Sequence, residues 1–115
     1  MKLSDIFEIK YGVNLELNKM ETIDKISNDA VNFVSRTDKN NGVTARVKII
    51  DGVEPQAVGT ISVASGGSPL ASFLQPEPYY SGRDLYVLTT KQKMTDEEKI
   101  YYCICIKKKD RKSVV

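Results

Sequence analysis

The sequence contains no histidine. Its absence removes the side chain that most often serves as a general base and as a metal ligand near neutral pH. Ser65 and Ser68 flank the glycine pair of "SGGS", but a serine nucleophile needs a base beside it, and the sequence indicates none. A phosphate-binding loop would need a lysine after the glycines, where Pro69 and Leu70 stand instead. The stretch therefore predicts a turn.

Long apolar runs are also absent, and no stretch is long enough to span a bilayer. Asp5, Glu8 and Lys10 interrupt the region where a secretory signal needs unbroken apolar sequence. Cys103 and Cys105, the two cysteines, are too close in sequence to bridge each other, and on a helix they would lie about 200° apart. We therefore expect a reducing, cytoplasmic setting, no metal and no cofactor.

Positive charge is in small excess, with a net charge of +2 over 115 residues. The excess comes from the stretch "KKKDRK", Lys107 to Lys112, and the rest of the chain carries more acidic than basic residues. The overall charge thus gives no support for a generally basic nucleic-acid binder. We expect one domain over residues 1–106 and a disordered or non-native basic tail over residues 107–115.

Apolar alternation and turn residues predict an α+β domain, with a twisted, mostly antiparallel sheet of four or more short strands and one or two helices. Ser4 and Gly12 bracket a short helical turn, and Asn41-Gly42 marks a tight turn. The stretch from Leu15 to Met20 has some helical character. The expected strands are Ala30 to Thr37, Val43 to Ile50, Val58 to Ser65 and Asp84 to Thr90.

The last element carries the clearest helix signal. Thr95 and Glu98 form a capping box, with Thr95 at the N-cap and Glu98 three residues later. The apolar stripe of this helix is expected to contain Ile100, Tyr101, Ile104 and Cys105.

One enzyme-like pattern involves Asp84, Glu97 and Lys99, which imitate the acidic and Glu-x-Lys set of many metal-dependent nucleases. In such enzymes the Glu-x-Lys pair shares one face of a strand. Here the pair falls in the capped first turn of a helix, where acids normally face solvent. The nuclease hypothesis therefore requires the three groups to converge in space.

Two polar clusters have the composition of loops that read another polymer. "SRTDKNNG", Ser35 to Gly42, supplies arginine, lysine and asparagine, the side chains that pair with base edges. In the second cluster, Gly66 and Gly67 would let the backbone approach a ligand closely. The side chains of that cluster are Ser65, Ser68, Gln75, Tyr79, Tyr80 and Arg83. A solvated hairpin and a proline-rich connector explain the same composition without a ligand.

Several motifs occur in a recognisable order: "L-x-D-I-F-E-I-x-x-G" from Leu3, "FVSRTDKNNGV", "ISVASGGSPLASFLQPEPYYSGRDLYVLTTK" and "MTDEEKIYYCICI". Together they resemble the target recognition domain of restriction–modification specificity subunits, of type I and related type II systems. The resemblance implies sequence-specific recognition of double-stranded DNA in the major groove, with cleavage and methylation left to methyltransferase and restriction subunits or domains. Relatives continue past the final helix, so it also implies that the domain is incomplete at its C-terminal end.

The DNA-binding candidates combine the polar clusters with the positions that match the family motifs. They are Arg36, Thr37, Lys39, Asn40, Asn41, Ser65, Ser68, Gln75, Tyr80 and Arg83. The alternative from another class is a protein-interaction module that docks a methyltransferase or restriction subunit. The salt dependence of binding separates the two, because phosphate contacts weaken steeply with salt and an apolar interface does not.

Overall fold

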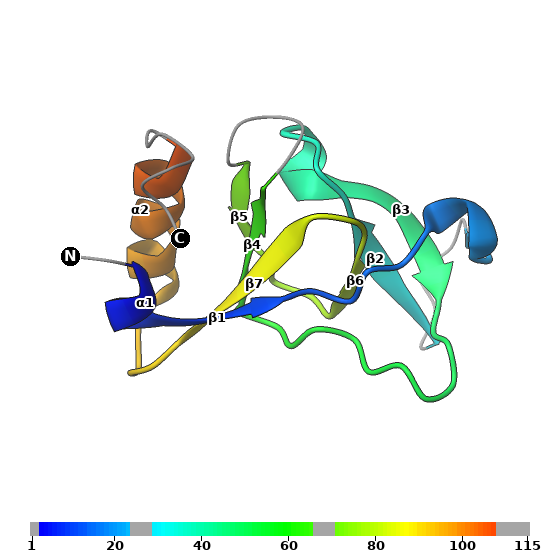
Figure 1. The fold of residues 1–115 in the computed structure, drawn as a ribbon, viewed down its shortest axis with the longest axis horizontal. Coiled ribbons are helices and arrows are strands. Elements are labelled where there is room, and N and C mark those ends of the chain that lie inside the picture. Colours follow the sequence, from blue (N-terminus) through cyan, green and yellow to red (C-terminus); the bar gives the residue numbers. More distant parts are fainter. Residues whose placement is uncertain (1–2, 24–28, 66–70, 108–115) are drawn as a thin grey trace.

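The computed structural model describes residues 3–23, 29–65 and 71–107, and these residues form an α+β domain with two sheets (Figure 1). The expected fold class and the mostly antiparallel pairing are confirmed, and the strands are shared between two sheets. The four-stranded sheet has the order β1-β7-β4-β5, with β1 at Phe7–Tyr11, β4 at Ile61–Ala64, β5 at Ser72–Leu74 and β7 at Leu85–Thr90. The three-stranded sheet has the order β3-β2-β6, with β2 at Ala30–Val34, β3 at Val43–Lys48 and β6 at Tyr79–Ser81.

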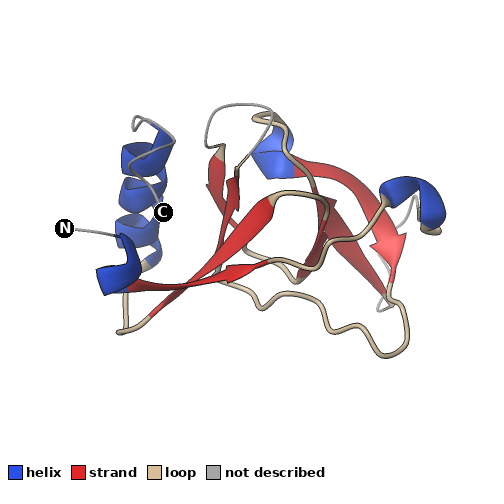
Figure 2. Cartoon of the chain, viewed as in Figure 1, coloured by secondary structure: helices blue, strands red, loops and turns tan. Residues whose placement is uncertain are grey.

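Short helices complete the fold: α1 at Leu3–Ile6, and the 3-10 turns η1 at Leu17–Lys19 and η2 at Asn40–Gly42. The long helix α2, Asp96–Lys107, covers the four-stranded sheet at the end of the molecule opposite β3 (Figure 2). Among the described residues, none of the helices is long and apolar enough to span a membrane.

An apolar cluster joins the two sheets. Val34 from β2 and Tyr79 from β6 pack with Ala64, Leu85 and Val87 of the four-stranded sheet. A backbone hydrogen bond links β2 to the turn after β6, from the Gly82 N–H to the Val34 carbonyl at 2.9 Å. Burial of these side chains fixes how the strand ends of one sheet meet those of the other.

Three strands were not predicted. Phe7–Tyr11, expected as a helical turn, forms β1 and pairs antiparallel with β7 from Phe7↔Thr90 to Tyr11↔Tyr86. The proline-rich stretch, expected as a connector, contributes β5 and β6. β5 pairs with β4, and β6 runs parallel to β2. These pairings connect residues far apart in sequence, so the local signals for a cap or a loop did not show them.

The predicted helix and its capping box are confirmed, but the buried face of α2 was predicted wrongly. Cys103 and Ile106 are buried, whereas Ile100, Tyr101 and Ile104 are 48%, 62% and 47% exposed. The helix carries apolar residues all around, so periodicity alone did not say which face meets the sheet.

Lys107, which we assigned to the tail, is the last residue of α2. Its amino group lies 4.2 Å from the centre of the Phe73 ring, over its face. The rest of the expected basic tail, residues 108–115, lies outside the described residues.

Replacing Thr95 with alanine is expected to destabilise the chain by about 0.5–2 kcal/mol. The Thr95 hydroxyl oxygen accepts the Glu98 N–H at 3.2 Å, and Glu98 Oε1 accepts the Thr95 N–H at 3.2 Å. Urea unfolding checks the change, and Thr95→Ser, which keeps the hydroxyl, is the control. An equal loss of stability in both variants would show that the cap contributes little.

Stability is also expected to fall in alkali, beginning near pH 9. Burial raises the pKa of the Cys103 thiol from 9.0 to about 11, outweighing the nearby Lys107 charge, and burial raises the pKa of the Tyr79 hydroxyl from 10.0 to about 12. The folded state therefore keeps both groups neutral where the unfolded chain ionises, so their contributions are present below pH 9 and 10 and are lost as pH rises through 11 and 12. Unfolding midpoints of wild type and Cys103→Ala across this window test the claim. An unchanged pH slope in Cys103→Ala would contradict it.

Candidate nucleic-acid interface

Arg36 and Asp84, which lie 48 residues apart in sequence, form an ion pair at the protein surface. Arg36 Nη1 lies 3.2 Å from Asp84 Oδ2, and the two side chains are 41% and 45% exposed. Arg36 comes shortly after β2, and Asp84 directly precedes β7. The pair therefore connects the two polar clusters that the sequence places far apart.

Strand direction explains this meeting. β2 and β6 are parallel, with Val34 opposite Ser81, so Arg36 and Arg83 both follow the C-terminal ends of their strands and lie at the same end of the sheet. β1 and β4 each run antiparallel to β7, with Tyr11 opposite Tyr86 and Ala64 opposite Leu85. Their C-terminal ends thus lie beside the start of β7. We call the surface formed by Tyr11, Arg36, Ser65, Arg83 and Asp84 the strand-end corner.

Asp84 contacts three other residues of the strand-end corner, Tyr11, Arg36 and Ser65. Its backbone is left-handed, with φ at +59°, which is unusual for a residue other than glycine. The Tyr11 hydroxyl accepts the Asp84 N–H at 2.8 Å and donates to Asp84 Oδ1 at 3.3 Å. The Asp84 carbonyl accepts both the N–H and the hydroxyl of Ser65, each at 2.9 Å. Backbone and side-chain contacts together hold this conformation, a pattern that clusters at functional sites.

Gly66 and Gly67, where the sequence predicts that the backbone approaches a ligand closely, come directly after Ser65. Gly66, Gly67 and Ser68 are outside the described residues, so their expected role stays a prediction. Ser65 itself is fixed to the corner through Asp84, the residue that Arg36 also contacts.

The expected tight turn at Asn41-Gly42 is present, and its asparagines help to hold it. Asn40 and Asn41 have φ of +52° and +56°, a conformation that asparagine tolerates better than most residues. The Asn40 side-chain amide donates to the Val43 carbonyl, and that of Asn41 donates to the Leu74 carbonyl, both at 3.0 Å. Thr37 Oγ1 accepts the Lys39 N–H at 3.2 Å, and the Lys39 side chain is exposed.

Two candidate residues, Gln75 and Tyr80, are fully buried. Gln75 Nε2 donates to the Asn41 carbonyl at 2.9 Å and to Ser62 Oγ at 3.1 Å. The Tyr80 hydroxyl donates to the Val53 carbonyl at 2.6 Å and accepts the Ile50 N–H at 2.9 Å. With no exposed surface in this conformation, both side chains hold neighbouring loops in place.

Charges of both signs surround the strand-end corner. Arg83 is exposed, and its Nη2 lies 3.8 Å from Glu16 Oε1. Exposed pairs at such distances are weak, so the Arg83 guanidinium is available to a competing anion. The corner is therefore an arrangement of individual arginines beside carboxylates, not a broad basic patch.

The nuclease hypothesis is not supported, because its three residues do not converge. Lys99 Nζ donates to the Gly59 carbonyl at 2.9 Å, just before β4, while Asp84 contacts Ser65 directly after β4. The length of β4, roughly 13 Å at the usual rise per residue, lies between these contacts. Among the described residues, no group of three or more histidine, cysteine, aspartate or glutamate side chains is placed to hold a metal ion.

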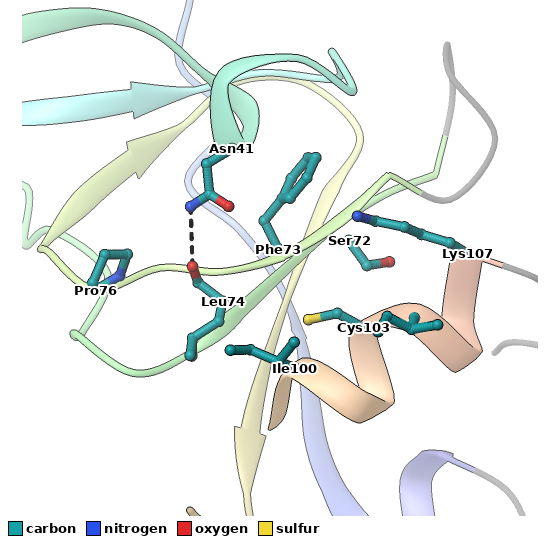
Figure 3. A pocket seen from close by; sticks show the side chains of 9 residues that line it. Asn41, Ser72, Phe73, Leu74, Pro76, Ile100, Cys103 and Lys107 are labelled. Carbon is teal, nitrogen blue, oxygen red and sulfur yellow. Dashed lines mark hydrogen bonds between the residues drawn. The ribbon is translucent and has the colours of Figure 1, made fainter. Parts of the chain in front are cut away.

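A pocket of about 460 Å³ lies between β5 and α2, and none of the residues that line it belongs to the strand-end corner (Figure 3). Its walls are mainly apolar, with Phe73, Leu74, Ile100 and Ile104, and Lys107 stands at one side. The Cys103 thiol lines it, but burial raises its pKa to about 11, so the thiol stays protonated and a poor nucleophile near neutral pH. This arrangement suits packing better than chemistry.

Comparison with known proteins identifies the class of domain. The sequence matches the family described as type I restriction modification DNA specificity domain over residues 1–115. The chain therefore belongs to this family, and its resemblance to specificity subunits is confirmed. No curated protein is significantly similar to it.

A solved structure with a similar fold is the S subunit of a type I restriction-modification system from M. genitalium, with a TM-score of 0.59 and 21% sequence identity. The similarity covers 90% of this chain and 24% of that chain, so the chain spans about a quarter of that S subunit. At this identity the likeness concerns the fold.

Tyr11 and Asp84 were missed as members of the candidate interface. Asp84 was considered only for a metal site, and its left-handed backbone has no local sequence signature. The available signal was "SGRD", a polar turn that leads into the strand expected from Asp84, since a polar turn at a strand end is a common place for binding residues.

Proposed function

We propose that the chain recognises a base sequence in double-stranded DNA and performs no catalysis by itself. The observation that carries this proposal is the strand-end corner, where Arg36 of one sheet and Ser65 of the other meet on Asp84 in a chain of the specificity-domain family. Arginine pairs with the O6 and N7 edge of guanine in the major groove, and strand-end loops are suited to reach that groove.

The candidate residues divide into two groups under this proposal. Arg36, Lys39 and Arg83 are exposed and would contact DNA, as would Ser68. Thr37, Asn40, Asn41, Ser65, Gln75 and Tyr80 would hold the loops that present them, because their polar groups already bond within the chain.

Selection from a random pool of duplexes tests the proposal, followed by mobility-shift titration at several salt concentrations. We expect one enriched sequence, and an affinity for it that falls steeply with salt because phosphate contacts release counterions. A pool with no enriched sequence after repeated rounds would contradict the proposal.

The exposed face of α2 supports a second role, which is docking of a methyltransferase or restriction subunit. Ile100, Tyr101 and Ile104 are large, apolar and exposed on one helix, and exposed apolar clusters often mark protein interfaces. A reducing cytoplasmic setting for such a complex is consistent with the free thiols of Cys103 and Cys105.

Replacing Tyr101 and Ile104 together with serine is expected to weaken association with the methyltransferase subunit and to leave DNA affinity unchanged. The reason is that α2 lies at the end of the molecule opposite β3, on the far side of the four-stranded sheet from the three-stranded one (Figure 1). Co-elution with the subunit and mobility shift measure the two effects, with Glu97→Ser on the polar first turn as the control. Unimpaired co-elution would remove this face from the interface.

A further inference from the structure

Resting on the proposed function, we infer that Asp84 is a positioning residue that makes Arg36 select a base rather than grip any phosphate. Asp84 divides its carboxylate between two partners: Oδ2 faces Arg36 Nη1 at 3.2 Å, and Oδ1 accepts from the Tyr11 hydroxyl at 3.3 Å. The orientation of the carboxylate is thus set from the side of β1, independently of Arg36.

The contact with Asp84 leaves most of the Arg36 guanidinium free to bind. The group carries five N–H donors, the carboxylate contact involves Nη1, and the side chain is 41% exposed. The remaining donors can form the paired hydrogen bonds that distinguish guanine from other bases. Holding the side chain in one orientation before binding reduces the entropy lost when those bonds form.

The negative charge of Asp84 also affects how Arg36 discriminates between DNA sequences. An unpaired arginine strengthens binding to every sequence, because it neutralises a phosphate and releases counterions. A carboxylate 3.2 Å away offsets that charge and repels phosphate, while hydrogen bonding to a base edge is retained. Asp84 therefore lowers affinity for unrelated DNA more than affinity for the target, which is one physical route to specificity.

The surroundings of Asp84 distinguish it from an ordinary surface ion pair, which would contribute little. Its left-handed backbone is held by the Tyr11 hydroxyl on the amide side and by Ser65 on the carbonyl side. These bonds hold the carboxylate in place independently of Arg36. Arg36 therefore has a charged partner at a constant position, which keeps the guanidinium in the orientation from which its other donors can bind.

Asp84→Asn tests the inference, because asparagine keeps the shape, the tolerance for a left-handed backbone and an oxygen for Tyr11 while removing the charge. Affinities are measured for the duplex selected by the wild type and for a scrambled duplex, each across a salt series. Asp51→Asn is the matched control, since it makes the same change of charge in the turn beyond the far end of β3.

For Asp84→Asn we expect tighter binding to the scrambled duplex, a salt slope steeper by about one and a specificity ratio lower by about tenfold. Asp51→Asn should leave the ratio unchanged. An unchanged ratio in Asp84→Asn, or an equal fall in both variants, would overturn the inference. Failure of the wild type to bind any duplex would instead overturn the proposed function.

Tyr11→Phe provides an independent variant, because it removes the hydroxyl that orients Asp84 and leaves every charge in place. We expect its specificity ratio to fall through weaker binding to the selected duplex, without a steeper salt slope. If Asp84→Asn does not fold, as judged by circular dichroism, this variant decides: a lower ratio supports the inference and an unchanged ratio overturns it.

Discussion

Replacing Arg36 with alanine is expected to weaken binding to the selected duplex by about 1–3 kcal/mol, roughly 5- to 150-fold, and to relax selectivity at one base position. Arg36 is the candidate that combines an exposed guanidinium with a fixed orientation, through its contact with Asp84. Mobility shift with duplexes altered one position at a time measures both effects.

Arg83→Ala and Lys48→Ala are controls for the Arg36 prediction. Arg83 lies at the same end of the sheet but contacts only Glu16, at 3.8 Å, among the ion pairs seen in the described part of the chain. Its loss should weaken binding to all sequences alike, as expected for a phosphate contact. Lys48 is exposed at the far end of β3, and its replacement should change little. If Arg36→Ala changes affinity and selectivity as little as Lys48→Ala does, Arg36 does not contact DNA.

Elements with a strong local signal were predicted from the sequence. β2, β3, β4 and β7 follow from β-branched runs and turn residues, and the start of α2 follows from the capping box at Thr95. β1, β5 and β6 were not predicted, because each is defined by a partner strand far away in sequence. The alternation of apolar and polar residues over Phe7–Tyr11 is short, and the cap signal at Ser4 and the glycine at residue 12 favoured a helical turn. Pairing with β7 makes this stretch a strand.

The candidate interface was predicted in part for the same reason. Arg36 and Ser65 were selected because polar residues at strand ends can read bases, and the structure places both on Asp84. Gln75 and Tyr80 were selected as members of the second polar cluster and as motif positions, and the structure shows them buried with internal partners. A motif indicates that a residue type is needed, but it does not indicate whether the side chain contacts DNA at the surface or holds loops in place from the interior.

Gly12 is another residue whose type was noticed in the sequence but whose role was not, and its replacement is expected to cause the largest loss of stability. The sequence suggested a helix end there, but Gly12 follows β1, and its N–H donates to the Leu85 carbonyl at 2.8 Å. A Cβ on residue 12 would collide with Ser81 Oγ and would lie 3.1 Å from both Ser81 Cβ and the Leu85 carbonyl oxygen. Glycine is required at this position because two strands approach it closely.

Replacing Gly12 with alanine is therefore expected to destabilise the chain by about 2–4 kcal/mol, the combined scale of overpacking and a disrupted buried hydrogen bond. Ser81 is fully buried and its hydroxyl donates to the Val13 carbonyl at 2.9 Å, so it cannot turn away without losing that bond. Each kcal/mol should lower the melting temperature by about 4–8 °C in a domain of this size. Thermal unfolding followed by circular dichroism measures the change.

Two further variants separate the collision from a general effect of adding a side chain. Gly52 has φ of +82° and no atom within 4 Å of an added Cβ, so Gly52→Ala should cost only the left-handed backbone, about 1 kcal/mol. Ser81→Gly removes both Ser81 atoms that an added Cβ would meet, so Gly12→Ala should cost less in that background than in the wild type. If the cost is the same in both backgrounds, the close approach of Ser81 is not what requires glycine at residue 12. In that case the close contact of an added Cβ with the Leu85 carbonyl oxygen, at 3.1 Å, is what requires glycine.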